Sequence, residues 1–234
     1  MPGGPDLILT VTRSGVRAAI PAGFPETMLC MPVRHLTMPV PQIMGFLWGR
    51  NPAGPCIRKQ DRAMRYKIVR KQPNSKMCLV CGLQNDFGLY TSFYELENGE
   101  LLAIFKPRKE HQSYPGRLHG GIVSTILDET IGRAIMISHA DRFWGVTVEI
   151  TIRFKQPVPL DHELRVIGRI TRDAKKIFEG TGEILLADGS VAAEAHGKYM
   201  KLPLEQIADF KAEEQNWKVR NMPEDPEFVD IEKK

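Results

Sequence analysis

Residue types that could do chemistry gather in the run LHGGIVSTILDETIGRAIM, which spans positions 118–136. The run opens with His119, Gly120 and Gly121, and Asp128 follows nine positions after the histidine. A carboxylate can act as a general base or as a nucleophile. The free N–H groups at a helix start, together with the helix dipole, suit a negatively charged oxygen. We therefore take Asp128 and the His-Gly-Gly turn as the candidate site.

The segment that carries these residues has the spacing of a buried helix. Its apolar positions cover more than half of a helical wheel, which is more than a surface helix needs. These positions are Ile122, Val123, Ile126, Leu127, Ile131, Ala134 and Ile135. A carboxylate among them must be paired with a cation, be solvated by water in a cleft or have a function, because burying an isolated charge costs several kcal/mol.

Two adjacent acids compete for the role. Glu129 precedes Arg133 by four positions, which is the favoured orientation for an exposed ion pair on a helix. Asp128 shares its side of the helix with Thr125 and Gly132, which are small enough to leave room for a ligand. We therefore favour Asp128 as the functional carboxylate.

The elements around this helix read as strands. Two precede it and four follow it, and they cover residues 89–96, 101–106, 144–154, 163–172, 177–187 and 191–200. Asn98-Gly99 and Asp188-Gly189 have the composition of two-residue hairpin turns. A hairpin-linked antiparallel sheet has to bury one face, and the apolar helix is the element available. The sequence predicts an α+β fold in which an antiparallel sheet wraps around one central helix.

The two ends of the chain differ from this centre. Nine prolines before position 56 interrupt each potential helix or strand, so residues 1–63 are expected to form an irregular or disordered N-terminal extension. Residues 64–202 are the expected folded domain. Residues 203–234 are expected to form a peripheral C-terminal helix and a charged tail.

Composition narrows the possible partners and the location. Lys and Arg exceed Asp and Glu by only four, which gives no argument for a nucleic-acid partner. No apolar run approaches the roughly 18 residues that span a bilayer, and no secretion signal opens the chain, so no membrane partner is predicted. The four cysteines lie before position 82, which fits a reducing, cytoplasmic location.

Two of these cysteines form half of a zinc-ribbon pattern. Cys78 and Cys81 are two residues apart and are followed by Gly82, but no second pair follows and the nearest downstream histidine, His111, is far along the chain. We favour small buried residues around a turn over metal ligands. No metal or other cofactor is predicted.

Taken together, these motifs resemble a known family. The combination of His-Gly-Gly at the helix start, Asp128 nine positions later and the strand Gly145-Val146-Thr147-Val148 is similar to the hotdog fold of acyl-CoA thioesterases, more narrowly to their phenylacetyl-CoA-type branch. The resemblance covers about residues 78–202. It implies hydrolysis of an acyl-CoA thioester to the free acid and CoA, without a cofactor.

The resemblance also implies roles for single residues. Gly120 resembles the residue whose backbone N–H holds the thioester carbonyl, and Asp128 resembles the carboxylate that acts as general base or nucleophile. His119 looks like the residue that shapes the turn and contacts the acyl or thiol side. Thr147 falls where related enzymes carry a Ser or Thr that can hold water.

Substrate binding is assigned by the same resemblance to Gly121, Gln112 and Ser113. Ser113 stands where some relatives have an asparagine, six residues before the motif histidine, and the adjacent Gln112 is an alternative for the thioester-orienting role.

Family members pair through their sheets, so the resemblance implies a homodimer or a dimer of dimers in which Asp128 of one chain faces Gly120 of the other. Two other functions stay open: another hotdog CoA-thioester enzyme such as a hydratase, and a non-catalytic acyl-CoA-binding or regulatory module. A structural origin of the motif also remains, with His119 satisfied by backbone and the glycines needed for close packing.

Overall fold

The structure is a computed structural model that describes residues 7–12, 15–19, 63–140, 142–207 and 217–232. All of them lie in one of the two structural units of the chain. Residues 20–62, which make up most of the expected irregular extension, lie outside the described part.

An antiparallel sheet dominates the described residues. Its ten strands follow the order β10-β3-β4-β5-β7-β8-β9-β6-β1-β2. The strands are β1 (Leu7–Thr12), β2 (Gly15–Ala19), β3 (Met64–Lys71), β4 (Ser92–Leu96), β5 (Leu101–Phe105), β6 (Trp144–Phe154), β7 (Leu164–Asp173), β8 (Ile177–Leu185), β9 (Val191–Leu202) and β10 (Phe228–Ile231). Asn98-Gly99 and Asp188-Gly189 lie in the β4–β5 and β8–β9 turns, where both glycines adopt the positive φ that such turns require.

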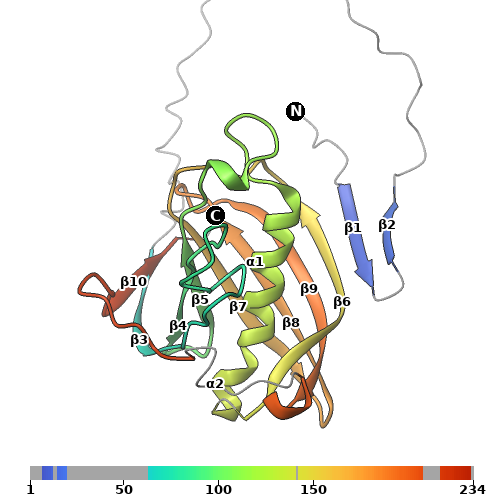
Figure 1. Cartoon of the computed structure of the whole chain (residues 1–234), viewed down its shortest axis with the longest axis vertical. Helices are drawn as coiled ribbons and strands as arrows, with labels where there is room; N and C mark the ends of the chain where they lie inside the picture. Colours follow the sequence, from blue (N-terminus) through green and yellow to red (C-terminus); the bar gives the residue numbers. More distant parts are fainter. Residues whose placement is uncertain (1–6, 13–14, 20–62, 141, 208–216, 233–234) are drawn as a thin grey trace, which may run out of the picture. The chain divides into compact units, whose positions relative to one another are not determined.

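A single long helix, α1 (Gly120–Arg133), runs along the sheet, and the short helix α2 (Ile135–His139) follows it. Figure 1 shows strands β5, β7, β8, β9 and β6 curving around α1, which contacts each of them. A 3-10 turn, Lys109–His111, lies in the loop that leads from β5 to α1. A long antiparallel sheet curled around one helix is the hotdog architecture, and the fold expected from the sequence is confirmed.

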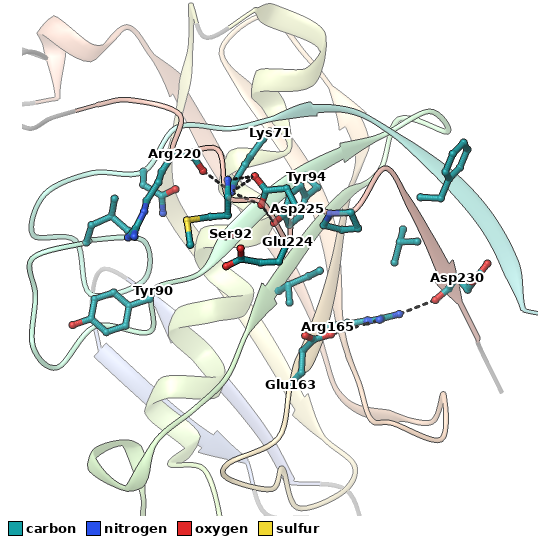
Figure 2. Close-up of a pocket in the computed structure, with 17 residues that line it drawn as sticks. Lys71, Tyr90, Ser92, Tyr94, Glu163, Arg165, Arg220, Glu224, Asp225 and Asp230 are labelled. Atoms are coloured by element: carbon teal, nitrogen blue, oxygen red, sulfur yellow. Dashed lines mark hydrogen bonds and ion pairs between the residues drawn. The ribbon is translucent and has the colours of Figure 1, made fainter.

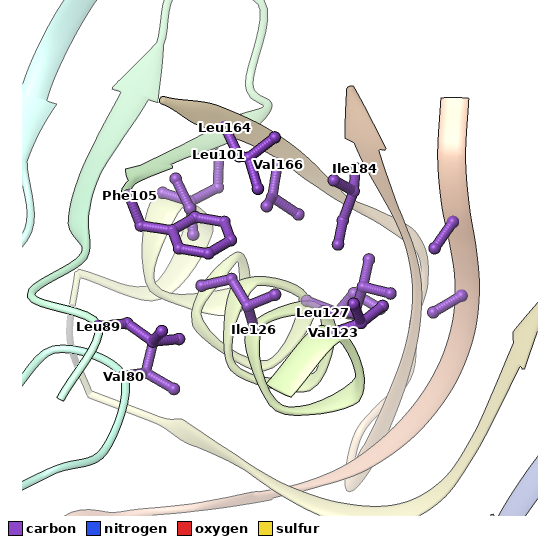
Figure 3. Close-up of a cluster of buried hydrophobic side chains, with 14 of the residues drawn as sticks. Val80, Leu89, Leu101, Phe105, Val123, Ile126, Leu127, Leu164, Val166 and Ile184 are labelled. Atoms are coloured by element: carbon purple, nitrogen blue, oxygen red, sulfur yellow. The ribbon is translucent and has the colours of Figure 1, made fainter. Parts of the chain in front are cut away.

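The core lies between α1 and the concave face of the sheet. Figure 3 shows Val123, Ile126 and Leu127 of α1 surrounded by apolar side chains from the strands and from the loop before β4. Glycines let the helix approach closely: a Cβ atom at Gly182 would lie 2.9 Å from Ile131, and one at Gly168 would lie 2.8 Å from the Thr130 carbonyl oxygen. The predicted helix is therefore buried on most sides, as its apolar wheel requires.

The N-terminal segment departs from the expected irregularity at two places. Strands β1 and β2 form a hairpin, and β1 pairs with residues Glu149–Phe154 of β6. The prolines of this segment flank the hairpin, and none falls within either strand, so both strands can donate to the ladder. The expectation of an irregular extension is therefore wrong for these two strands.

The C-terminal segment also differs from its prediction. Its described helical part is a 3-10 turn, Leu204–Gln206, and residues 208–216 lie outside the described part. The expected charged tail contains a strand, because β10 pairs with β3 and buries Val229 and Ile231 against Tyr94 and Leu102. The two buried residues of β10 alternate with the exposed Phe228 and Asp230.

None of the helices in the described part of the chain has the length and apolarity needed to cross a bilayer.

Candidate active site

The start of α1 is organised by His119. Its side-chain Nδ1 accepts a hydrogen bond from the Gly121 N–H at 2.9 Å, and its carbonyl oxygen accepts from the N–H groups of Ile122 and Val123. A Cβ atom at Gly121 would lie 3.0 Å from Nδ1, so the glycine allows this cap to form. Among the residues that the structure describes, none accepts a hydrogen bond from the Gly120 N–H. The helix start therefore presents a donor that a ligand oxygen can use.

The loop before the helix is tied to this turn. The His119 N–H donates to the carbonyl oxygen of His111, a buried residue whose own ring bonds to the Phe87 carbonyl oxygen. Gln112 accepts a hydrogen bond from the Gly116 N–H at 3.0 Å through Oε1. Gln112 and Ser113 are both exposed beside the helix start.

Asp128 lies eight residues further along α1 and is held by two strands. The Thr147 hydroxyl on β6 donates to its carboxylate, at 2.9 Å from Oδ1 and 3.1 Å from Oδ2. The Tyr199 hydroxyl on β9 donates to Oδ1 at 3.1 Å. Burial raises the pKa of the Asp128 carboxyl, while the hydrogen bonds from Thr147 and Tyr199 act to lower it and nearby Glu129 raises it further. This combination is typical of a carboxylate that has a chemical role.

A small cavity of about 60 Å³ opens beside the carboxylate. It is lined by Asp128, Glu129, Gly132, Arg133, Met136, Trp144, Gly145 and Thr147. Gly132 and Gly145 pack backbone to backbone here, since a Cβ atom at Gly145 would lie 2.8 Å from the Gly132 carbonyl oxygen. The cavity has room for water beside Asp128 and is far too small for an acyl chain.

The structure brings the predicted residues together in two groups. His119, Gly120 and Gly121 form one group, and Asp128 and Thr147 form the other. Asp128 lies eight positions after Gly120 in the helix, which is about 12 Å along the helix axis at about 1.5 Å per residue. Within one chain the carboxylate cannot reach a carbonyl carbon bound at the Gly120 N–H.

Tyr199 is the residue of this site that the sequence analysis missed. It is fully buried, and its ring stacks on Phe178 at a centroid distance of 5.0 Å. Burial raises the pKa of its hydroxyl, as does the charge of Asp128, so it remains a proton donor. Its position in the alternating pattern of the strand could have indicated its burial. Ala195, Gly197 and Tyr199 are every second residue, and all three lie on the buried face of β9.

The ion pair between Glu129 and Arg133 forms as predicted, but its exposure was predicted wrongly. Arg133 Nε lies 2.7 Å from Glu129 Oε1, while the Arg133 side chain is only 3% exposed. Arg133 also donates to the Pro73 carbonyl oxygen and to Cys81 Sγ, each at 3.0 Å. The four-residue spacing of Glu129 and Arg133 could not predict the burial of Arg133, because Pro73 and Cys81 belong to the loop before β4.

A larger cavity, of about 820 Å³, lies elsewhere in the described part of the chain. Figure 2 shows that Lys71, Tyr94, Arg165 and Asp225 contribute to its walls. Tyr94 belongs to the cluster on the face of the sheet turned away from α1, whereas the adjacent Phe93 packs in the helix-side core. Two of its basic groups are engaged: Lys71 pairs with Asp225 at 2.6 Å, and Arg165 donates to the Asp230 carbonyl oxygen at 2.7 Å. This cavity is therefore separate from the Asp128 site.

Comparison with known proteins identifies the family of the central segment. Residues 115–193 match the family model described as Thioesterase superfamily, and this range contains the helix start, Asp128 and Thr147. This segment belongs to the thioesterase superfamily. The resemblance predicted from the HGG and Asp128 motifs is thereby confirmed.

The proteins to which this chain is similar include named acyl-CoA thioesterases. Acyl-coenzyme A thioesterase THEM4 of Xenopus laevis is 25% identical over 115 residues, which cover 48% of this chain and 50% of the relative. Acyl-coenzyme A thioesterase THEM5 of Homo sapiens is 23% identical over 118 residues, covering 50% and 47%. The chain spans about half the length of these curated relatives. A crystallised thioesterase superfamily protein is 24% identical, with a TM-score of 0.49 and coverage of 53% of this chain and 59% of the other.

Proposed function

We propose that this chain hydrolyses an acyl-CoA thioester to the free acid and CoA. The observation that carries the proposal is the Asp128 carboxylate, which is held on an apolar helix by the hydroxyl groups of Thr147 and Tyr199 beside a water-sized cavity. The similarity to acyl-CoA thioesterases over about half of the chain supports the same reaction.

The chemistry divides between the two groups of residues. Thioester hydrolysis needs a polarised carbonyl, an attacking oxygen and a leaving thiolate, whose low basicity spares the enzyme a strong general acid. The Gly120 N–H and the dipole of α1 stabilise the negative charge that develops on the carbonyl oxygen. Asp128 removes a proton from water as the water attacks the carbonyl carbon, or its carboxylate attacks the carbon itself. The C–S bond then breaks and CoA leaves as the thiolate. In the second case water then hydrolyses the acyl-Asp128 anhydride to the free acid and restores the carboxylate.

The other predicted residues have supporting roles. Since His119 Nδ1 accepts a hydrogen bond, the proton of its neutral ring lies on Nε2 and can be donated to the substrate. The Thr147 hydroxyl donates a hydrogen bond to Asp128, so the Thr147 oxygen can accept a hydrogen bond from the attacking water. Gln112, Ser113 and Gly121 lie at the helix start, where they can contact the thioester and the pantetheine.

The separation of Gly120 from Asp128 supports a site shared between two chains. A homodimer or a dimer of dimers can bring Asp128 of one chain to Gly120 of the other, which one chain cannot do over about 12 Å. Strand β1 pairs with β6 only at residues 149–154, so the half of β6 that carries Thr147 has no strand beside it on this edge within the described residues. That half is available to a second chain.

The two cysteines in the described part, Cys78 and Cys81, form no disulfide, which supports the expected cytoplasmic location.

The proposal is tested by incubating the full chain with a panel of acyl-CoA esters and measuring the released thiol with a colorimetric reagent. Release that is proportional to the enzyme concentration supports the proposal. Hydration of an enoyl-CoA without thiol release would indicate a hydratase instead. Saturable binding of intact acyl-CoA esters without turnover would indicate a binding or regulatory module. Either outcome would overturn thioester hydrolysis.

A further inference from the structure

A buried cluster of potential metal ligands lies on the side of α1 next to the Asp128 site. The side-chain ligand atoms of Cys78, Cys81 and Glu129 all lie within 4.8 Å of one another. Cys81 is fully buried, and Cys78 and Glu129 are half-buried. The two cysteines come from the loop between β3 and β4, and the glutamate comes from the middle of the central helix. The proposed hydrolysis uses none of these three side chains.

The backbone of the cysteine loop favours a metal-binding turn. The Val80 N–H donates to Cys78 Sγ at 3.3 Å, and the Gly82 N–H donates to the Cys78 carbonyl oxygen at 2.8 Å. A Cβ atom at Gly82 would lie 2.4 Å from that carbonyl oxygen, so only glycine allows this turn. The turn presents both sulfur atoms on one side, and an N–H donor to sulfur stabilises the thiolate form that binds metals.

The charges of the cluster balance with a divalent cation. Arg133 donates to Cys81 Sγ at 3.0 Å and pairs with Glu129 at 2.7 Å. Two thiolates and one carboxylate carry three negative charges, and the buried guanidinium offsets one of them. A divalent cation offsets the other two, so the filled site would leave no net charge in this part of the core.

The spacing of the ligand atoms suits a small tetrahedral ion. With metal–ligand bonds of about 2.0–2.3 Å, the sulfur and oxygen ligands of a tetrahedral zinc site lie about 3.5–3.8 Å apart. The three atoms need to move inward by less than about 1 Å to reach this geometry. Two sulfur ligands and one oxygen ligand suit zinc better than magnesium or calcium, which prefer oxygen alone.

We propose that Cys78, Cys81 and Glu129 bind one zinc ion, with the fourth position taken by water. The third ligand lies 48 residues after the second on a different element, which is why the sequence pattern alone gave no metal site. The ion would join the cysteine loop to α1 at the residue next to Asp128. Its role is structural: it fixes the position of the helix at the carboxylate.

Zinc binding is measured directly on the full chain. The purified protein is stripped of metal with a chelator under reducing conditions, and zinc alone is then titrated against a chromophoric chelator. We expect one equivalent per chain and a rise in melting temperature. Replacing zinc by Co²⁺ should give the intense thiolate-to-cobalt charge-transfer band and the d–d bands of a tetrahedral site with two sulfur ligands.

Variants assign the ligands. Cys78→Ser and Cys81→Ser should abolish stoichiometric binding, and Glu129→Gln should weaken it by about 10-fold or more. The matched control is the double variant Cys30→Ser, Cys56→Ser, which leaves the proposed ligands intact and should bind zinc as the parent does. Alkylation of the unmodified chain followed by mass spectrometry needs no variant to fold. Zinc should protect Cys78 and Cys81 from the reagent.

Three outcomes would overturn the proposal. The first is that the reduced protein binds no zinc at micromolar concentration. The second is that both cysteine variants bind zinc as well as the parent does. Alternatively, Cys78 and Cys81 could form a reversible disulfide and bind no metal, which would make them a redox pair. None of these readouts depends on thioester hydrolysis, so a failure of the proposed function leaves the zinc test intact.

Discussion

The Tyr199 hydroxyl lies 3.1 Å from Asp128 Oδ1, although the two residues are 71 positions apart in the sequence. Thr147 and Tyr199 are direct partners in the pairing of β6 with β9, and both donate to the same carboxylate. Two adjacent strands therefore fix the orientation of Asp128 before any substrate binds. The burial that raises its pKa and the donors that lower it come from the same contacts with the sheet.

Removing the Tyr199 hydroxyl should change the pH dependence of turnover. In the proposed reaction Asp128 has to be charged, so its raised pKa should determine the acidic limb of the kcat profile. Because the hydrogen bond from Tyr199 lowers that pKa, Tyr199→Phe should move the acidic limb to higher pH. The matched control is Tyr94→Phe, which removes a 2.7 Å hydrogen bond to Asp225 on the other face of the sheet. A shift of equal size in both variants would refute the role of Tyr199.

Gly120→Pro tests the backbone donor at the helix start. Gly120 is the first residue of α1, where proline is well tolerated, and His119 has the extended conformation that a following proline requires. The substitution deletes the proposed oxyanion donor, so kcat should fall by about 100-fold, with little change in melting temperature. Gly120→Ala keeps the N–H, and its Cβ would meet nothing closer than Phe154 at 3.7 Å. Equal turnover in the proline variant and the parent would exclude the donor role.

A mixing experiment tests whether two chains share the site. Asp128→Asn and Gly120→Pro should each be inactive alone. Refolding them together produces mixed dimers with one intact site, and random pairing should restore roughly one quarter of the parent activity. If each chain carries its own complete site, the mixture should remain as inactive as its components.

The C-terminal strand should contribute to stability. Ile231 of β10 is 5% exposed, so Ile231→Ala should lower the free energy of unfolding by about 2–4 kcal/mol. Val219 lies in the same tail but is 45% exposed, and Val219→Ala should change that free energy by less than about 0.5 kcal/mol. Chemical denaturation measures both values. Equal effects would mean that β10 does not pack on the sheet in solution.

The sequence predicted the parts of the fold that depend on local pattern. Neighbouring residues determine the apolar face of α1, the alternation of strands β6–β9 and the turns at Gly99 and Gly189. The predicted bounds of these elements agree with the structure within a few residues. Strands β1 and β10 were missed because they are short and are stabilised by pairing with β6 and β3. Such pairing depends on distant partners and not on the period of the strand itself.

The same division holds for the site. Asp128 could be chosen over Glu129 from the helix wheel, since that choice depends on which side of the helix each residue faces. Tyr199 and the contact of Arg133 with Cys81 could not be predicted, because they join segments 71 and 52 residues apart. Glu129 was expected to face solvent, yet it meets a buried arginine and two thiols that the wheel cannot reveal.

The turnover of Asp128→Asn tests the central claim most directly. The asparagine keeps the size of the side chain and removes the charge that activates water or attacks carbon, so kcat for acyl-CoA hydrolysis should fall by about 100-fold or more. The raised pKa means that Asp128 binds a proton more readily in the folded chain than in the unfolded chain. Its charge therefore costs stability as pH rises above the unfolded pKa, and the variant should melt at or above the parent temperature at neutral pH.

Glu129→Gln is the neighbouring comparison for this measurement. It should lose stability through its buried partner Arg133, and its turnover should fall much less than that of Asp128→Asn. Measured side by side, a loss of turnover in Asp128→Asn with the fold intact is the result that the account predicts. Parent-like kcat in Asp128→Asn would contradict it, and a collapse of kcat in Glu129→Gln alone would move the catalytic role to the adjacent residue.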